Sequence, residues 1–307
     1  MEQKVVVLLF AIAISTNGYS QQYLKPEPTY KEVSYDKHER NILDFWQAES
    51  DSSTPLVLFI HGGGFQALSK EKLKADHLNK LLEAGISVAA MNYRLVKTDP
   101  LPAAFQDAKR ALQFLRFKSE EWNIDKSRIG AFGGSAGAML SMWLAFHDDM
   151  ADIRNNDKVM RESTRIICVA TMGGQITFDR RWMEQSIPGG FIHKNPAFLR
   201  IFSIDSFEEL DSPEMQELIR EISPVTHISA NDPPIYMEYE MALDSQIPED
   251  ISLRKSWALH HVIFGYTLMG RMRALNIESH LNCPGAESAY QSIPEFFIAK
   301  MLDKNNY

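Results

Sequence analysis

The chain has 307 residues, of which 45% are hydrophobic and 23% are charged, and its formal net charge is −8. This composition excludes collagen, a coiled-coil rod, a disulfide-rich miniprotein and a disordered chain. The negative charge argues against a nucleic-acid partner, because a phosphate backbone binds basic surfaces. A chain of this length can bury roughly three quarters of its unfolded surface, so its core requires neither metal nor disulfides.

The first twenty residues predict a secretory signal peptide. An unbroken apolar run from Val5 to Ile14 is followed by polar residues, and Gly18 to Ser20 offers a cleavage site before Gln21. This run is too short to cross about 30 Å of hydrocarbon, and no later segment is long and apolar enough. A buried N-terminal strand is the alternative. We therefore expect a secreted or periplasmic protein with no stable membrane span.

The mature chain, residues 21–307, shows alternating strand and helix patterns. Predicted strands cover residues 31–35, 41–46, 56–60, 86–91, 128–132, 165–171, 235–243 and 276–283. Predicted helices cover residues 70–83, 136–146, 256–275 and 294–302, and another follows Pro102. The first two strands form a probable hairpin, and the later alternation is typical of βαβ units. The pattern predicts an α/β domain with a mostly parallel sheet and helices on both faces.

Residues 178–223 interrupt this alternation. The segment contains Pro188-Gly189-Gly190, one clear helix that begins at Ser212-Pro213, and scattered aromatic residues, namely Trp182, Phe191, Phe198, Phe202 and Phe207. Long irregular insertions usually carry function, and aromatic residues argue against disorder. We interpret the segment as a cap over the strand ends, whose aromatic side chains could contact an acyl group or a sugar. A surface subdomain without such a role is the alternative.

Two motifs carry the chemistry. Gly133-Gly134-Ser135-Ala136-Gly137 is a GxSxG sequence between a predicted strand and an apolar helix, where a tight turn would expose the serine hydroxyl. His61-Gly62-Gly63-Gly64-Phe65 follows the strand that ends at Ile60, and its glycines let backbone N–H groups converge on one oxygen. Each motif alone is a weak signal, but in this order and context the pair predicts a serine hydrolase.

Together with Asn92-Tyr93-Arg94-Leu95 and Asn231-Asp232-Pro233-Pro234, these motifs resemble the α/β-hydrolases of the hormone-sensitive-lipase and bacterial feruloyl-esterase-like (BD-FAE-like) type. The resemblance covers nearly all of the mature chain. It implies an α/β-hydrolase fold and a Ser–His–Asp hydrolase of carboxylic esters, often acyl groups on plant polysaccharides. It also implies that Ser135 is the nucleophile and that the N–H groups of Gly63, Gly64 and Ala136 form the oxyanion hole.

The resemblance also implies a catalytic acid after the predicted strand 235–243. Asp244 starts an Asp-x-x-x-Pro sequence there, as in the family, and is the candidate that would orient and stabilise an imidazolium. The alternative is a loop aspartate that caps the next segment.

The general base departs from the family pattern. The family has histidine at the end of a Pro-Gly-x-x-His turn, where this chain has Ser288. His260 and His261 are the candidates to replace it, because they are expected at the rim of the strand ends and a triad is defined by geometry rather than by chain order. A helix-entry pair bonded to the backbone is the alternative. His61 is expected to shape the glycine loop instead.

The remaining residues predict no cofactor and no metal, since the nine histidines show no spacing typical of a metal site. Cys168 and Cys283 could pair after export, but two buried free thiols are the simpler interpretation. The leading hypothesis is an exported serine esterase acting on a small-molecule or carbohydrate ester. The alternatives are a catalytically impaired binding protein of the same fold and a peptidase.

Overall fold

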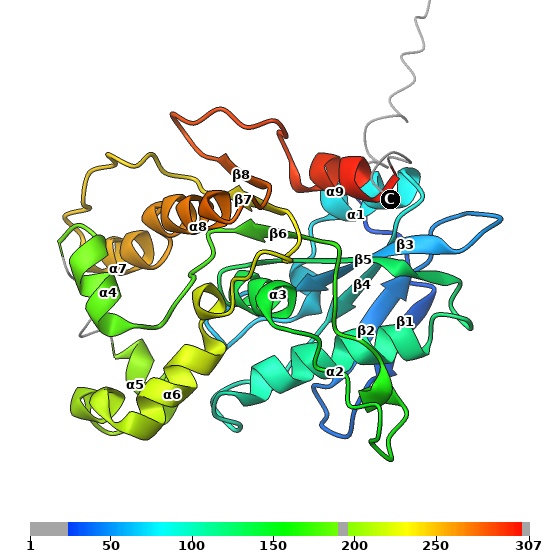
Figure 1. Ribbon diagram of the computed structural model, residues 1–307, viewed down its shortest axis with the longest axis horizontal. Helices are drawn as coiled ribbons and strands as arrows, with labels where there is room; N and C mark the ends of the chain where they lie inside the picture. Colours follow the sequence, from blue (N-terminus) through cyan, green and yellow to red (C-terminus); the bar gives the residue numbers. More distant parts are fainter. Residues whose placement is uncertain (1–23, 190–195, 303–307) are drawn as a thin grey trace, which may run out of the picture.

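The computed structural model describes residues 24–189 and 196–302 (Figure 1). The predicted signal peptide and Phe191 lie outside these residues. Eight strands form one sheet in the order β1-β2-β4-β3-β5-β6-β7-β8. They are β1 (Tyr30–Ser34), β2 (Ile42–Trp46), β3 (Thr54–Ile60), β4 (Ser87–Met91), β5 (Ile124–Gly134), β6 (Cys168–Met172), β7 (Ile235–Glu238) and β8 (Ser279–Asn282).

The sheet is parallel from β4 to β8, and only β1 and β2 run antiparallel to their neighbours. The helices are α1 (Ala75–Glu83), α2 (Ala103–Phe117), α3 (Ala136–Phe146), α4 (Arg180–Ser186), α5 (Ala197–Phe202), α6 (Pro213–Ile222), α7 (Ile251–Leu259), α8 (Ile263–Ala274) and α9 (Ile293–Leu302). The predicted mostly parallel sheet with helices on both faces is confirmed.

Helices cover both faces of the sheet (Figure 1), and an apolar layer lies between the sheet and the helices on each face. Leu58 and Ile60 of β3 pack into the layer beneath α2 and α3, and Val57 and Phe59 pack into the layer beneath α1 and α9. Successive side chains of a strand point to opposite faces, so a strand covered on both faces must be apolar throughout. This is why the continuous run at the end of β3 predicts a central strand.

The helix expected over residues 256–275 is instead two helices, and this prediction was wrong. α7 ends at Leu259 and α8 begins at Ile263, with His260 as the residue that ends α7. The N–H of Ile263 donates to His261 Nδ1 at 3.1 Å, which satisfies a backbone group at the start of α8. His260 therefore lies at the break between the two helices, and its ring points towards the turn that follows β5.

The region 178–223 contains α4, α5, α6 and the short 3-10 helix η5 (Phe207–Asp211), although the sequence showed only one of these helices clearly. Phe178 stacks edge-on against Phe198 and Phe202, with ring centroids 5.9 and 5.4 Å apart, and also contacts Phe65. Phe178, Phe198 and Phe202 are buried in the main core. These three residues therefore hold the insertion to the domain, and Phe198 and Phe202, which we expected as substrate contacts, are core residues instead.

Three further findings concern the sequence predictions. The helix predicted over residues 70–83 begins as a 3-10 turn, η2 (Lys70–Lys72), and continues as α1. Cys168 and Cys283 are both buried and free. No helix in the described ranges combines the length and the apolar character that crossing a bilayer requires.

A buried ion pair ties η2 to β2 and yields a stability prediction. Lys70 Nζ lies 2.7 Å from Asp44 Oδ2, and both side chains are almost fully buried. We expect Asp44→Ala to lower the free energy of unfolding by about 3–5 kcal/mol, because it leaves the Lys70 ammonium without its main buried partner. Urea denaturation at constant m value measures this loss.

The matched control is Asp76→Ala, which removes an exposed pair between Lys80 Nζ and Asp76 Oδ2, 3.0 Å apart. Exposed pairs contribute roughly 0–1 kcal/mol, so this variant should unfold close to the wild-type midpoint. Equal losses in the two variants would contradict a special role for the buried pair.

Candidate active site

Ser135 lies in a strained turn between β5 and α3. Its backbone has φ 51° and ψ −116°, a conformation that costs a non-glycine residue about 1–3 kcal/mol. The Ser135 N–H donates to the Met172 carbonyl oxygen at 2.9 Å, which anchors the turn to the end of β6. The sequence predicts a tight turn at this serine, and the structure has such a turn, while the role of Ser135 as nucleophile stays a prediction.

The glycines around the serine are required by close backbone packing. A Cβ at Gly133 would lie 2.5 Å from the Ile60 carbonyl oxygen, and a Cβ at Gly137 would lie 2.0 Å from the same oxygen. Such contacts are far shorter than van der Waals distance, so a side chain at either position would push α3 away from the end of β3. The GxSxG pattern thus reflects how closely the serine turn approaches the glycine loop.

The glycine loop after β3 is shaped by its backbone and by Tyr93. Gly63 and Gly64 have φ values of 101° and 58°, which glycine adopts at little cost. The Tyr93 hydroxyl lies 3.0 and 3.1 Å from the carbonyl oxygens of His61 and Gly62 and donates to them. The His61 ring stacks on Tyr93, and burial lowers the pKa of His61 to about 4, so the ring is neutral at pH 7.

The predicted oxyanion-hole donors have no competing partners. Ala136 is the first residue of α3, so its N–H has no carbonyl one turn earlier in the helix. Within the described ranges, no protein group accepts a hydrogen bond from the N–H of Gly63 or Gly64. All three groups are therefore available to a ligand, and their role as an oxyanion hole stays a prediction.

His260 reaches the serine across 125 positions of sequence. Its Nε2 lies 3.0 Å from Ser135 Oγ, and its Nδ1 lies 2.9 Å from the Ser256 carbonyl oxygen one turn back in α7. A carbonyl oxygen only accepts, so Nδ1 carries the ring proton in this pair and the lone pair of Nε2 faces the hydroxyl. A general base for Ser135 needs this tautomer.

Gly173 provides the space for the His260 ring. It follows β6 with a φ of 56°, and a Cβ at this position would lie 3.3 Å from His260 Cδ2. Met172, the preceding residue, holds the Ser135 N–H through its carbonyl. The end of β6 therefore positions both the serine backbone and the histidine ring.

The structure does not bring Asp244 to the histidine. β7 ends at Glu238, five residues before the predicted end of this strand, and Asp244 lies exposed in the following loop. His260 Nδ1 contacts the Ser256 carbonyl instead of a carboxylate. Asp244 is thus a loop residue, as the alternative expected, but the side chain that caps α7 is that of Asp250.

His261 and Ser288 also lie away from the serine hydroxyl. The His261 ring is buried edge-on against Trp257, with ring centroids 4.6 Å apart, and its Nδ1 accepts from the Ile263 N–H. Both histidines contact the backbone, as the helix-entry alternative expected, but His260 also contacts Ser135 Oγ. Ser288, where the family pattern has histidine, accepts from the Tyr290 N–H at 3.4 Å.

A cavity of about 1110 Å³ opens beside Ser135 and His260. Its polar lining comes from Lys72, Lys74, His77, Glu238, Glu240 and Asn282, and its apolar lining includes Leu68, Met172, Tyr239, Met241 and Trp257. Burial lowers the pKa of His77 to about 4 and raises the pKa of Glu238. The cavity lining thus offers both hydrogen-bond donors and acceptors.

The described part of region 178–223 contributes no lining residue to this cavity. The region contacts the glycine loop through Arg200, whose Nε donates to Gln66 Oε1 at 2.8 Å. A lid function for the region stays a prediction. The described residues that could jointly hold a metal ion are His147, Glu221 and His227, and they lie at the other end of α3 from Ser135.

A sheet in this strand order, with a serine in a strained turn after β5 and a glycine loop after β3, is the α/β-hydrolase fold. Solved structures agree. A truncated carbohydrate esterase from gut microbiota is similar with a TM-score of 0.66 and 20% identity over 89% of this chain and 96% of that one. An acetyl ester-xyloside bifunctional hydrolase from Caldicellulosiruptor lactoaceticus is similar with a TM-score of 0.56 and 24% identity, over 81% and 79%.

The BD-FAE family model matches residues 43–253, and the chain belongs to this family. A probable carboxylic ester hydrolase, LipM of Mycobacterium tuberculosis, is 27% identical over 210 residues, which is 67% of this chain and 46% of the relative. Probable carboxylesterase 2 of Arabidopsis thaliana is 36% identical over 104 residues, 32% of this chain and 33% of the relative. The chain thus spans less than half the length of these curated relatives.

Sequence reasoning missed two contributors to the site. The Ser256 carbonyl orients the histidine, and its signal was only the spacing of four residues to His260, which places the two groups one helical turn apart. Gly173 follows a predicted strand, so its place at the carboxyl end of the sheet could be predicted. The neighbouring sequence gives no sign that the His260 ring packs against it.

The geometry predicts how a fluorophosphonate probe reacts. We expect wild-type protein to be labelled at Ser135, and Ser135→Ala to remain unlabelled. His260→Ala should slow labelling roughly 10²–10⁴-fold, because it removes the group that takes the hydroxyl proton. The measurement is the second-order rate constant of labelling, followed by intact-protein mass spectrometry.

Asp244→Asn is the matched control and should label within about twofold of wild type, because its side chain does not contact His260. A rate for His260→Ala equal to that of wild type would remove His260 as the base. A loss of several hundredfold in Asp244→Asn would instead restore Asp244 to the triad.

Proposed function

We propose that this protein is an exported serine esterase that hydrolyses acyl esters of carbohydrates, with Ser135 as nucleophile and His260 as general base. The contact of 3.0 Å between Ser135 Oγ and His260 Nε2 carries the proposal, since it joins a strained serine to a base in the correct tautomer. Membership of the BD-FAE family and the carboxylic ester hydrolases among its relatives support the reaction class.

The reaction follows from the positions of these groups. Ser135 Oγ attacks the ester carbonyl carbon while its proton passes to His260 Nε2, and the N–H groups of Gly63, Gly64 and Ala136 bind the resulting oxyanion. The tetrahedral intermediate then expels the alcohol oxygen, which takes the proton from His260. Water, deprotonated by the same nitrogen, attacks the acyl-enzyme and releases the acid and the free serine.

His260 Nδ1 contacts the Ser256 carbonyl oxygen, where a complete triad has a carboxylate. The Ser256 carbonyl can fix the tautomer and hold the ring, which are two of the three contributions of a triad aspartate. It carries no full negative charge, so it stabilises the imidazolium less than a carboxylate does. We therefore expect an active enzyme with a slower proton-transfer step than a complete triad supports.

The cavity supports a carbohydrate ester as the substrate. At about 1110 Å³ it exceeds the volume of roughly 300–1,000 Å³ typical of drug-sized ligands, which leaves room for sugar units beside the acyl group. Its wall carries donors such as Lys72 and Lys74 and acceptors such as Glu238 and Glu240, as sugar hydroxyls require. The similar solved structures include a carbohydrate esterase and an acetyl ester-xyloside hydrolase.

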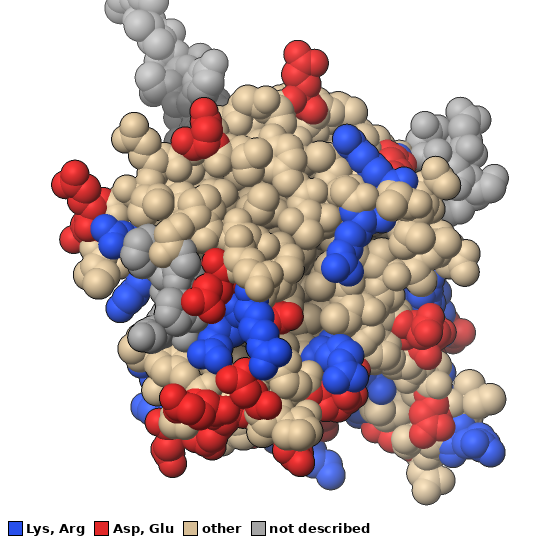
Figure 2. All heavy atoms as spheres, turned by 60° about the vertical axis from the view of Figure 1, so that its left-hand side comes forward, with Lys and Arg blue, Asp and Glu red and all other residues tan. Residues whose placement is uncertain are grey.

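Surface charge is consistent with a neutral substrate. On the face shown in Figure 2, basic side chains lie next to acidic ones and do not form a stripe of one sign. Arg180 and Arg181, for example, both pair with Asp211, at 2.8 and 3.4 Å. Such local pairing gives little attraction for a polyanion such as nucleic acid.

A catalytically impaired binding protein is the second candidate, and Ser288 at the family's histidine position favours it. The serine–histidine contact and the retained strain at Ser135 favour the enzyme, because strained turns are costly to keep without use. A peptidase of the same fold would use the same groups, so substrate tests separate it from an esterase.

The substrate proposal predicts two activities. Wild-type protein should hydrolyse p-nitrophenyl acetate and release acetate from acetylated xylo-oligosaccharides, and Ser135→Ala should do neither. The double variant Lys72→Ala/Lys74→Ala should raise KM for the oligosaccharide about tenfold, because it removes exposed donors of the cavity wall, and should change kcat/KM for p-nitrophenyl acetate by less than about twofold. Initial rates by absorbance and by acetate quantification give both values.

Lys97→Ala removes an exposed lysine that does not line the cavity and serves as the matched control. Equal effects of the double variant on both esters would argue against a sugar subsite. Hydrolysis of peptide p-nitroanilides without ester hydrolysis would identify a peptidase, and binding of the oligosaccharide without any turnover would favour the binding protein.

Export is tested by the N-terminus of the mature protein. Full-length protein expressed in a Gram-negative host should appear in the periplasm or medium with Gln21 as its first residue, since the apolar run before it would be removed. N-terminal sequencing reads the cleavage site. Leu8→Arg/Leu9→Arg interrupts the apolar run and should keep the chain uncleaved in the cytoplasm, whereas cytoplasmic retention of the unaltered chain would overturn export.

A further inference from the structure

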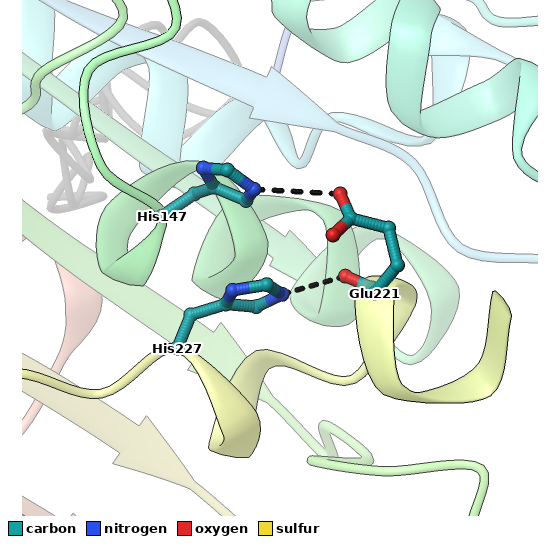
Figure 3. A group of neighbouring side chains, drawn as sticks. All are labelled: His147, Glu221 and His227. Atoms are coloured by element: carbon teal, nitrogen blue, oxygen red, sulfur yellow. Dashed lines mark hydrogen bonds and ion pairs between the residues drawn. The ribbon is translucent and has the colours of Figure 1, made fainter. Parts of the chain in front are cut away.

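Three side chains gather at the end of α3 that is remote from the serine. His147 ends α3, Glu221 lies in the last turn of α6, and His227 follows the short 3-10 helix η6 (Pro224–Thr226). Figure 3 shows the two imidazole rings one beside the other, with the Glu221 carboxylate facing His147 and the Glu221 backbone carbonyl facing His227. The ring centroids are 4.5 Å apart, and one ligand atom of each residue lies within 4.8 Å of the others.

Both ring nitrogens of His147 face oxygen atoms. Its Nδ1 lies 3.2 Å from the Asp148 carbonyl oxygen, and its Nε2 lies 3.4 Å from Glu221 Oε1. A neutral imidazole has one N–H and cannot donate to two acceptors, so one nitrogen faces an oxygen lone pair with its own. Either a second ring proton or a metal cation between Nε2 and the carboxylate removes this repulsion.

Helix capping explains only part of the cluster. The Glu221 carbonyl oxygen accepts from Trp143 Nε1 at 2.9 Å and from the His227 Nε2–H group at 2.6 Å, which satisfies a carbonyl at the end of α6. A metal ion bound through His227 Nε2 would displace that proton and this second hydrogen bond. Capping accounts neither for the second imidazole stacked on the first nor for the carboxylate that faces it. The two stacked rings would repel each other if both were protonated. A divalent ion instead accepts one nitrogen lone pair from each neutral ring.

We infer that His147, Glu221 and His227 form a binding site for a divalent transition-metal ion such as Zn²⁺. Two imidazoles and a carboxylate are a donor set that Zn²⁺ accepts, with water completing the tetrahedron. Imidazole nitrogen also selects Zn²⁺, Ni²⁺ and Cu²⁺ over Mg²⁺ and Ca²⁺, which prefer oxygen. The His147 and Glu221 side chains are 22% and 44% exposed, so an ion reaches them from solvent.

The site would be structural rather than catalytic. The 11 residues of α3 separate its two ends by roughly 16 Å at about 1.5 Å per residue, so a metal here does not touch the group that Ser135 attacks. Its ligands come from α3, α6 and the segment after η6, and α6 belongs to the region 178–223. A bound ion therefore joins the inserted helices to a core helix, and binding it stabilises the folded state.

Isothermal titration calorimetry with ZnCl₂ tests the site, using the full untagged chain after treatment with EDTA. We expect one Zn²⁺ per chain in the wild type, and at least about tenfold weaker binding in both His147→Gln and Glu221→Gln. In thermal melts, Zn²⁺ at a hundredfold excess over its Kd should raise the wild-type Tm by about 5 °C. Neither variant should show this rise, and Mg²⁺ should not produce it.

His38→Gln is the matched control, because His38 Nε2 faces Asp99 Oδ2 at 3.6 Å without a second imidazole, and it should bind Zn²⁺ like the wild type. Fluorophosphonate labelling at the wild-type rate shows that the His38, His147 and Glu221 variants are folded, and a two-state thermal melt in the absence of metal shows this for His260→Ala. Absence of saturable binding, or equal affinity in His147→Gln, Glu221→Gln and wild type, would overturn the site. Loss of binding in His260→Ala alone would move it to the serine cavity.

Discussion

The strained turn at Ser135 is the constraint on which the rest of the site depends. A serine with positive φ persists only where its surroundings hold it, and here the Met172 carbonyl and two close glycine contacts with the end of β3 do so. The same contacts set the distance between the serine hydroxyl and the glycine loop. The parallel strands β3, β5 and β6 all end at this edge, so the site lies at their carboxyl ends, where ligands of such sheets bind.

Because the serine is held in place, a general base has to come within hydrogen-bond distance of its hydroxyl. The serine cannot move without releasing its strain, so the histidine must reach it, and the chain achieves this by breaking a helix at His260 instead of using the turn after β8. Gly173 leaves room for the ring, and the Ser256 carbonyl orients it. In the proposed mechanism, His260 is the proton acceptor and the Ser256 carbonyl the orienting group, and both come from elements other than those of the family pattern.

Sequence patterns over a few residues predicted those elements whose bounds depend on neighbouring residues. α3 was expected over the residues that it occupies, because a glycine turn precedes it and its sequence is apolar throughout. β7 was overestimated by five residues, since Tyr239 is apolar and buried outside the strand, with its hydroxyl bonded to the Gly174 carbonyl. That burial arises from packing against the end of β6, which a strand pattern cannot distinguish from pairing. The misplaced strand end also made Asp244 a candidate acid.

The sequence alone determined the fold class, the serine turn and the glycine loop, because each depends on neighbours within a few positions or on a hydrophobic period. Only the tertiary structure decided between His260 and His261, because adjacent residues at a helix break point in different directions, one to Ser135 and the other into the core against Trp257. It alone also brought together His147, Glu221 and His227, whose spacing along the chain follows no motif. Proximity between separate elements is set by how the sheet and its helices pack, and that information is not local.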